Sequence, residues 1–153
     1  MADRVALGLM VSTVGSALFV VGLAQMEASA LQVLGIVLMI AGFGAAALAK
    51  RNEIGWALAC ALAGVALGIS AFYDFNLLFP DIAVRAGLAV AVGSLVAAFG
   101  FGRGSPRIAS AGMAIVALGS AFWIYSDGDS WWWQLGNVPF TAGAAWTAWA
   151  AWH

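Results

Sequence analysis

Long apolar runs alternate with short polar segments along the whole chain. Each run holds about 18 to 21 residues, and at a rise of 1.5 Å per residue such a helix spans roughly 27 to 31 Å, the thickness of the hydrocarbon core of a bilayer. The pattern predicts an all-α membrane protein, a bundle of six transmembrane helices that forms a single domain over residues 1–153. The predicted helices lie near residues 5–25, 30–49, 54–73, 82–101, 108–125 and 132–152.

The composition indicates that lipid, and not water, surrounds these helices. Apolar residues make up 64% of the chain and charged residues 8%, whereas an ordinary soluble domain has about 25% charged residues. A soluble fold of this size cannot bury so much apolar surface. The first run is longer than the apolar region of a signal peptide, so we expect it to be retained.

The basic residues test the six-helix prediction, because Lys and Arg collect on the cytoplasmic side of membrane proteins. All of them except Arg85 lie on one side of the predicted bundle, and five of the seven acidic residues lie on the other. We therefore predict a multi-pass protein of the plasma (inner) membrane with both termini in the cytoplasm. The basic side carries Arg4, Lys50, Arg51, Arg103 and Arg107, and the acidic side carries Glu27, Asp74, Asp81, Asp127 and Asp129.

Short similar motifs recur near the outer ends of the odd-numbered runs. They read GSALF at 15–19, ISAF at 69–72 and GSAF at 119–122. The motifs are separated by about the length of one helical hairpin. One interpretation is that the chain consists of three tandem parallel helical hairpins, related by an axis along the membrane normal. The alternative is that helices rich in Ala and Gly resemble one another through composition alone.

Small residues at helical spacing predict close helix packing. Gly8, Ser12 and Ser16 form one stripe of small residues, and Gly64 and Gly68 form a GxxxG motif. Such positions let the backbones of membrane helices approach each other. Packing within the bundle is the simpler interpretation, and a contact with a second copy or with other membrane subunits is the alternative. The lipid bilayer is the expected partner, and the net charge of −1 gives no reason to expect nucleic acid.

No Asp, Glu, Lys, Arg or His lies at the middle of a predicted helix, although such residues usually mark ion-coupled pumps. Arg85 lies about one turn into the fourth predicted helix, four residues after Asp81. This spacing predicts a local ion pair on one helix face. The alternative is a contact with an anion, with a lipid headgroup or with an acidic residue of another subunit. Asp81 and Arg85 are the best polar candidates of the sequence.

The sequence gives little basis for catalysis. The single cysteine, Cys60, lies in an apolar run, and the single histidine, His153, is the last residue. No nucleophile lies beside a base, and no spacing of metal ligands or phosphate-binding loop appears. We expect no enzyme activity, no metal site and no cofactor that the sequence requires. No motif is specific enough to name a family.

Six of the eight tryptophans lie in the last predicted helix and just before it. Residues 131–133 read WWW and are expected to anchor the outer interface, where tryptophan is enriched. Trp146, Trp149 and Trp152 recur every three residues and lie on one side of a helix. They are expected to contact lipid or neighbouring helices. The alternative is a face that binds a flat hydrophobic cofactor (a quinone, carotenoid, tetrapyrrole or lipid tail), with His153 as an axial ligand.

Three functions remain open from the sequence. The first is a non-enzymatic membrane protein that acts through helix packing, as an accessory or assembly subunit of a complex or as a homo-oligomer. The second is a small passive channel or transporter for a small solute or ion. The third is a membrane binder of a hydrophobic cofactor at the tryptophan face.

Overall fold

The computed structural model describes residues 2–25, 29–70, 80–126 and 131–153, and all structural statements concern these residues. The described chain is helical throughout and contains no strand. The six predicted helices are confirmed, with bounds within a few residues of the prediction. They are α1 (Ala2–Ala24), α2 (Ser29–Ala49), α3 (Glu53–Ser70), α4 (Pro80–Gly102), α5 (Pro106–Ser126) and α6 (Trp131–Trp152).

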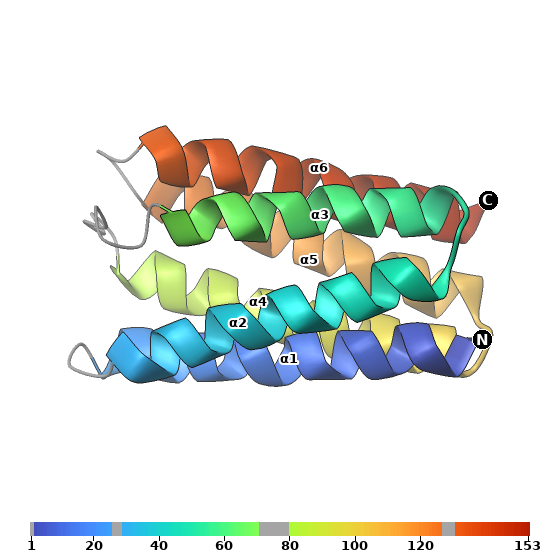
Figure 1. Cartoon of the computed structure of the whole chain (residues 1–153), viewed down its shortest axis with the longest axis horizontal. Coiled ribbons are helices and arrows are strands. Elements are labelled where there is room, and N and C mark those ends of the chain that lie inside the picture. The colour runs from blue at the N-terminus through green and yellow to red at the C-terminus, as the bar shows by residue number, and fades with distance from the viewer. Residues whose placement is uncertain (1, 26–28, 71–79, 127–130) are drawn as a thin grey trace.

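Four helices are long and apolar enough to cross a membrane. These are α1, α2, α4 and α5. The described apolar part of α3, Glu53–Leu67, is shorter, and α6 is interrupted by polar side chains such as Asn137 and Thr141. Figure 1 shows all six helices side by side along the length of one bundle, with both chain termini at the same end. The protein is therefore a helical bundle of the polytopic membrane class.

Local sequence explains where two of the helices end and begin. Gly104, with a φ of 64°, lies in the left-handed region that favours glycine. The amide of Ser105 donates to the carbonyl of Gly100 at 2.8 Å, and the amide of Gly104 donates to Phe101 at 3.2 Å. This pair of bonds is a Schellman motif, which ends α4. Pro106 then begins α5, a position where its missing N–H costs nothing.

Pro139 does not interrupt α6. The residue before a proline is biased away from helical geometry, yet α6 is continuous from Trp131 to Trp152. The proline leaves one helix carbonyl without its usual donor, and neighbouring helices commonly compensate for such losses in membrane bundles. The freed carbonyl is that of Leu135, four residues before the proline. The thiol of Cys60 on α3 donates to a different carbonyl, that of Pro139, at 3.6 Å.

The helices form a closed ring in which each helix packs against two others. Around the ring the order is α1, α2, α3, α6, α5 and α4, and α4 returns to α1. Among the described residues α3 packs along α6 and makes no substantial contact with α4. The packing therefore does not follow the three sequential hairpins that the sequence suggested, because the second of them would pair α3 with α4.

The predicted small-residue positions are used inside the bundle. Gly8 and Ser12 pack against α2, where a Cβ added at Gly8 would lie 2.6 Å from the carbonyl oxygen of Gly42. Ser16 instead faces α4, and its hydroxyl donates to the carbonyl of Gly87 at 3.0 Å. Gly64 packs against the backbone of α6. The side-chain surroundings of Gly68 lie outside the described part of the structure.

Candidate functional site

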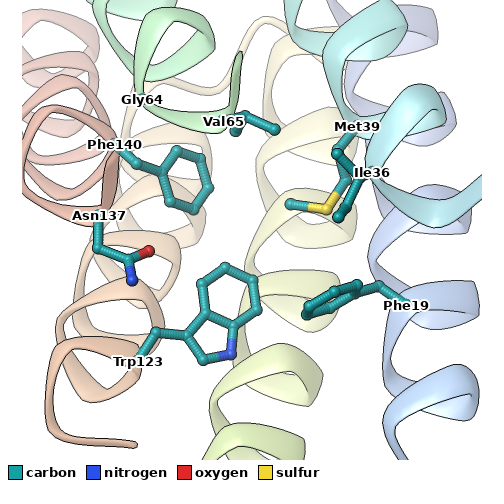
Figure 2. Close-up of a pocket in the computed structure, with 8 residues that line it drawn as sticks. All are labelled: Phe19, Ile36, Met39, Gly64, Val65, Trp123, Asn137 and Phe140. Carbon is teal, nitrogen blue, oxygen red and sulfur yellow. The ribbon is translucent and has the colours of Figure 1, made fainter. Parts of the chain in front are cut away.

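A cavity lies between the helices in the half of the bundle away from the termini. Five of the six helices contribute to its wall, and Figure 2 shows the side chains that line it. The space open to the centres of water-sized molecules is about 30 Å³, and one water needs roughly 10 to 15 Å³ by the same measure. The cavity in this conformation therefore holds two waters or a solute of a few heavy atoms. Its lining residues are Phe19, Ile36, Met39, Gly64, Val65, Trp123, Asn137 and Phe140.

Three aromatic rings form part of the wall. The rings of Phe19 and Trp123 meet edge to face with centroids 5.7 Å apart, and the rings of Trp123 and Phe140 are stacked at 6.1 Å. Phe43 is fully buried and packs edge to face on Phe140 at 5.5 Å. These geometries are the favoured ones for aromatic pairs. Trp123 is fixed further by the bond from its Nε1 to the carbonyl of Ala83 on α4, at 3.0 Å.

One polar side chain enters this apolar wall. Asn137 on α6 is only 5% exposed, and within the described part of the structure its Nδ2 has no hydrogen-bond partner. Figure 2 shows its amide directed into the space between the rings of Phe140 and Trp123. A buried amide donor without a partner costs roughly 1 to 3 kcal/mol. The cavity therefore offers a hydrogen-bond donor to a molecule with an acceptor atom, surrounded by aromatic and aliphatic carbon.

The predicted tryptophan face lies elsewhere. Trp146, Trp149 and Trp152 are 41%, 53% and 57% exposed and lie on the outer surface of α6. The Nε1 of Trp146 donates to Glu53 Oε1 at 2.9 Å. Trp149 stacks on the ring of His153, with centroids 4.7 Å apart. The three rings cover the surface of the bundle near the end that carries the termini, and none of them lines the central cavity.

The polar candidates Asp81 and Arg85 both lie exposed on the first turns of α4. The predicted ion pair between them is not formed in the described structure. The physical reason is their exposure, because solvated charges gain little from pairing and lose side-chain entropy when they pair. Neither residue lines the central cavity. A contact of either residue with an anion or a lipid headgroup remains a prediction.

The described residues contain no group of three or more His, Cys, Asp or Glu side chains that could hold a metal ion. A second cavity opens at the end of the bundle that carries the termini. Lys50, Phe101 and Ala151 are among its lining residues, and its space for water-sized centres is about 170 Å³. The Nζ of Lys50 lies 5.5 Å above the centre of the Phe101 ring. This second cavity is wider than the central one, and one charged group, the ammonium of Lys50, lies at its wall.

Sequence reasoning did not single out Asn137, Trp123 or Phe140. Asn137 lies between Gly136 and Pro139, two residues typical of helix breaks, and this setting gives no indication of a buried site. A signal was available, because Asn137 is one of very few amide side chains within the apolar runs, and such a residue needs a partner when lipid surrounds the helix.

No protein-family model, curated protein or solved structure matches this chain.

Proposed function

We propose that the chain is a non-enzymatic carrier that moves a small neutral solute passively across a membrane. The aromatic cavity is its binding site. The observation that carries the proposal is the unpartnered Nδ2 of Asn137 inside an apolar cavity at the centre of a closed ring of helices. In a bundle held only by packing, an apolar side chain at this position would avoid the cost of a buried free donor.

All six helices cross the membrane in this proposal, and both termini lie in the cytoplasm. The shared end of the two termini supports this arrangement (Figure 1). Lys50, Arg51, Arg103 and Arg107 lie in or next to the helix connections at that same end. Basic residues in short connections orient membrane proteins with that end in the cytoplasm. The cavity then lies in the outer half of the bundle, in the plasma (inner) membrane.

The lining residues define the solute class. The described wall carries no titratable group, so a charged solute would lose its hydration without compensation. Nδ2 of Asn137 is a donor and selects a solute with an acceptor, such as a carbonyl oxygen. Flat aromatic walls and the small volume favour a planar molecule of a few heavy atoms. Urea, acetamide and formamide have these properties.

The two other functions that the sequence left open have weaker support. The accessory-subunit hypothesis relied on small-residue faces, and Gly8, Ser12, Ser16 and Gly64 all pack within the chain. The cofactor hypothesis relied on the tryptophan trio, which lies on an exposed surface and not in a cavity. A quinone or a tetrapyrrole also exceeds the space of the central cavity.

Proteoliposomes test the proposal through stopped-flow light scattering after a gradient of urea, acetamide or glycerol is imposed. We expect the protein to accelerate the flux of urea and acetamide over that of empty vesicles and to accelerate glycerol less. Asn137→Leu should abolish the acceleration. The same substitution should raise the stability by about 1 kcal/mol, because it removes the unpaired donor. Val138→Leu, on the exposed side of the same turn, is the matched control and should retain the flux.

Two results would contradict the proposal. One is a wild-type protein that accelerates none of the three solutes. The other is an Asn137→Leu protein that is folded and transports as fast as the Val138→Leu control. Purification from native membranes in a stable complex with other subunits, together with the absence of flux, would favour the accessory-subunit function.

A further inference from the structure

The α1–α2 and α4–α5 hairpins are packed through the same backbone contacts. A Cβ added at Gly15 would lie 2.6 Å from the carbonyl oxygen of Gly35. A Cβ added at Gly93 would lie 2.7 Å from the carbonyl oxygen of Gly112. In both hairpins the added atom would lie equally close to the amide nitrogen four residues further along the partner helix. The two hairpins therefore share one packing register.

The contact between α3 and α6 shows the same pattern when it is viewed from either helix. A Cβ added at Gly64 on α3 would meet the carbonyl of Gly136 and the amide four residues later on α6. A Cβ added at Gly143 on α6 would meet the carbonyl of Ala57 and the amide four residues later on α3. Exchange of the two helices leaves this set of contacts unchanged, as a two-fold axis between them requires.

Sequence shifts of 77 to 79 residues relate the equivalent positions. The shifts are 93 − 15 = 78 from Gly15 to Gly93, 112 − 35 = 77 from Gly35 to Gly112 and 143 − 64 = 79 from Gly64 to Gly143. Residues 14–16 and 92–94 both read VGS. Figure 1 shows that α1 and α4 run in opposite directions along the bundle. The axis that relates α1–α3 to α4–α6 therefore lies across the bundle.

We propose that α1–α3 and α4–α6 form an inverted repeat, and that the bundle alternates between this structure and a second state. In that state the positions equivalent to the wall of the central cavity enclose a cavity in the other half, deeper in the bundle than the cavity beside Lys50. The inference rests on the proposed carrier function. Inverted repeats permit such an exchange, because each half can adopt the conformation of the other while the solute site remains at their interface. The structure described here is then the state with the outer cavity.

The positions equivalent to the cavity wall are closed in this structure. The shifts relate Asn137 to Leu58, Phe140 to Ala61 and Val65 to Ala144, and the three inner residues are fully buried. In the second state these residues line the inner cavity. Leu58 provides no hydrogen-bond donor, so the solute binds less tightly there than beside Asn137. The asymmetry assists release on the cytoplasmic side.

A pair of equivalent serines distinguishes the two states. Ser16 donates to the carbonyl of Gly87 across the α1–α4 contact at 3.0 Å. Its equivalent, Ser94, is fully buried, and its hydroxyl has no partner among the described residues. The position equivalent to Gly87 is Leu9, whose carbonyl accepts a bond from Thr13. In the second state Ser94 donates to α1, and Ser16 gives up its bond to α4.

Cysteine accessibility tests the exchange in a Cys60→Ala background. Inside-out vesicles that carry Ala144→Cys are treated with a membrane-impermeant maleimide, and Ala98→Cys is the matched buried control outside the equivalent cavity. We expect faster labelling of Ala144→Cys than of the control. Addition of Ser16→Ala should raise the labelling rate of Ala144→Cys about two- to tenfold, because the present state loses one buried hydrogen bond. Ser94→Ala should lower it by a similar factor. Ser16→Gly removes the same hydroxyl with less volume and should act as Ser16→Ala does.

The flux of urea measured on the same vesicles separates this inference from the proposed function. Equal labelling of the two cysteines, or a labelling rate that no serine substitution changes, would overturn the exchange even if urea flux persists. Absence of flux in the unsubstituted protein would contradict the carrier function, whatever the labelling shows. Maleimide on Ala144→Cys should also block the flux, whereas the Ala98→Cys protein should continue to transport.

Discussion

The two sides of α6 carry different side chains and make different contacts. One side is buried and presents Asn137, Phe140 and Ala144 to the centre of the ring. The other side is exposed and carries Val138, Trp149 and Trp152. Trp146, Trp149 and Trp152 are conspicuous in the sequence of this segment, yet they lie on the outer surface, and tryptophan commonly anchors a helix at the membrane interface. The side that lines the cavity is the one with the less conspicuous residues.

The difference shows that the surroundings of a membrane helix are set by its neighbours and not by its most distinctive residues. Lipid accepts a large aromatic ring as readily as a protein interior does, so apolar character does not indicate which side is buried. A small residue or a polar side chain without a hydrogen-bond partner is a better indicator of the side that is buried. Gly143 allows the backbone of α6 to approach α3 closely. The amide of Asn137 is tolerated at this depth only when protein encloses it or a hydrogen-bond partner binds it.

The largest contrast between the two sides is expected for Gly143→Leu. A Cβ at this position would lie 2.7 Å from the carbonyl oxygen of Ala57 and still closer to the amide nitrogen of Ala61. The α3–α6 contact must then separate, at a cost of about 3 kcal/mol or more. Unfolding in detergent, followed by far-ultraviolet circular dichroism, measures the loss. Ala145→Leu, two residues away on the exposed side, should leave the midpoint unchanged, and equal effects of the two variants would disprove the assignment of the buried side.

Phe140→Ala should have the next largest effect. The ring of Phe140 packs between Trp123 and Phe43 and closes one side of the cavity. Its loss removes both aromatic contacts and leaves a void, which costs about 3 kcal/mol in well-packed interiors. The enlarged cavity should also admit larger amides, so the flux of propionamide should rise relative to that of urea. An unchanged ratio of these fluxes, in a protein that remains folded, would separate Phe140 from the solute path.

The fold was largely predictable because bilayer thickness dictates it. The length of the apolar runs predicted six helices, and the basic residues predicted that both termini lie at one end of the bundle. Helix pairing was not predictable in the same way. Glycines such as Gly64 indicate a face for close approach, but their spacing does not say whether α4 or α6 provides the partner. The predicted pairing of α3 with α4 followed chain order, and the structure pairs α3 with α6.

The candidate site was not predictable for a related reason. Phe19 on α1 lies far in the sequence from Trp123 on α5 and Asn137 on α6, and it shares a cavity with them because the ring closes through the α3–α6 and α1–α4 contacts. The tryptophan trio, in contrast, could be placed on one helix side from its spacing alone. What the spacing could not show is that this side faces away from the bundle.

The smallest effect is expected for the double variant Trp146→Leu and Trp149→Leu. Both rings are about half exposed, and the bond from Trp146 to Glu53 lies at the surface. Surface substitutions of this kind change stability by about 0.5 kcal/mol or less. The urea flux should be unchanged, since neither ring reaches the cavity. An absorption band above 300 nm in the purified protein that disappears in the double variant would instead show a bound pigment on this surface. The exposed side of α6 would then bind a ligand, and function would no longer be confined to the buried side.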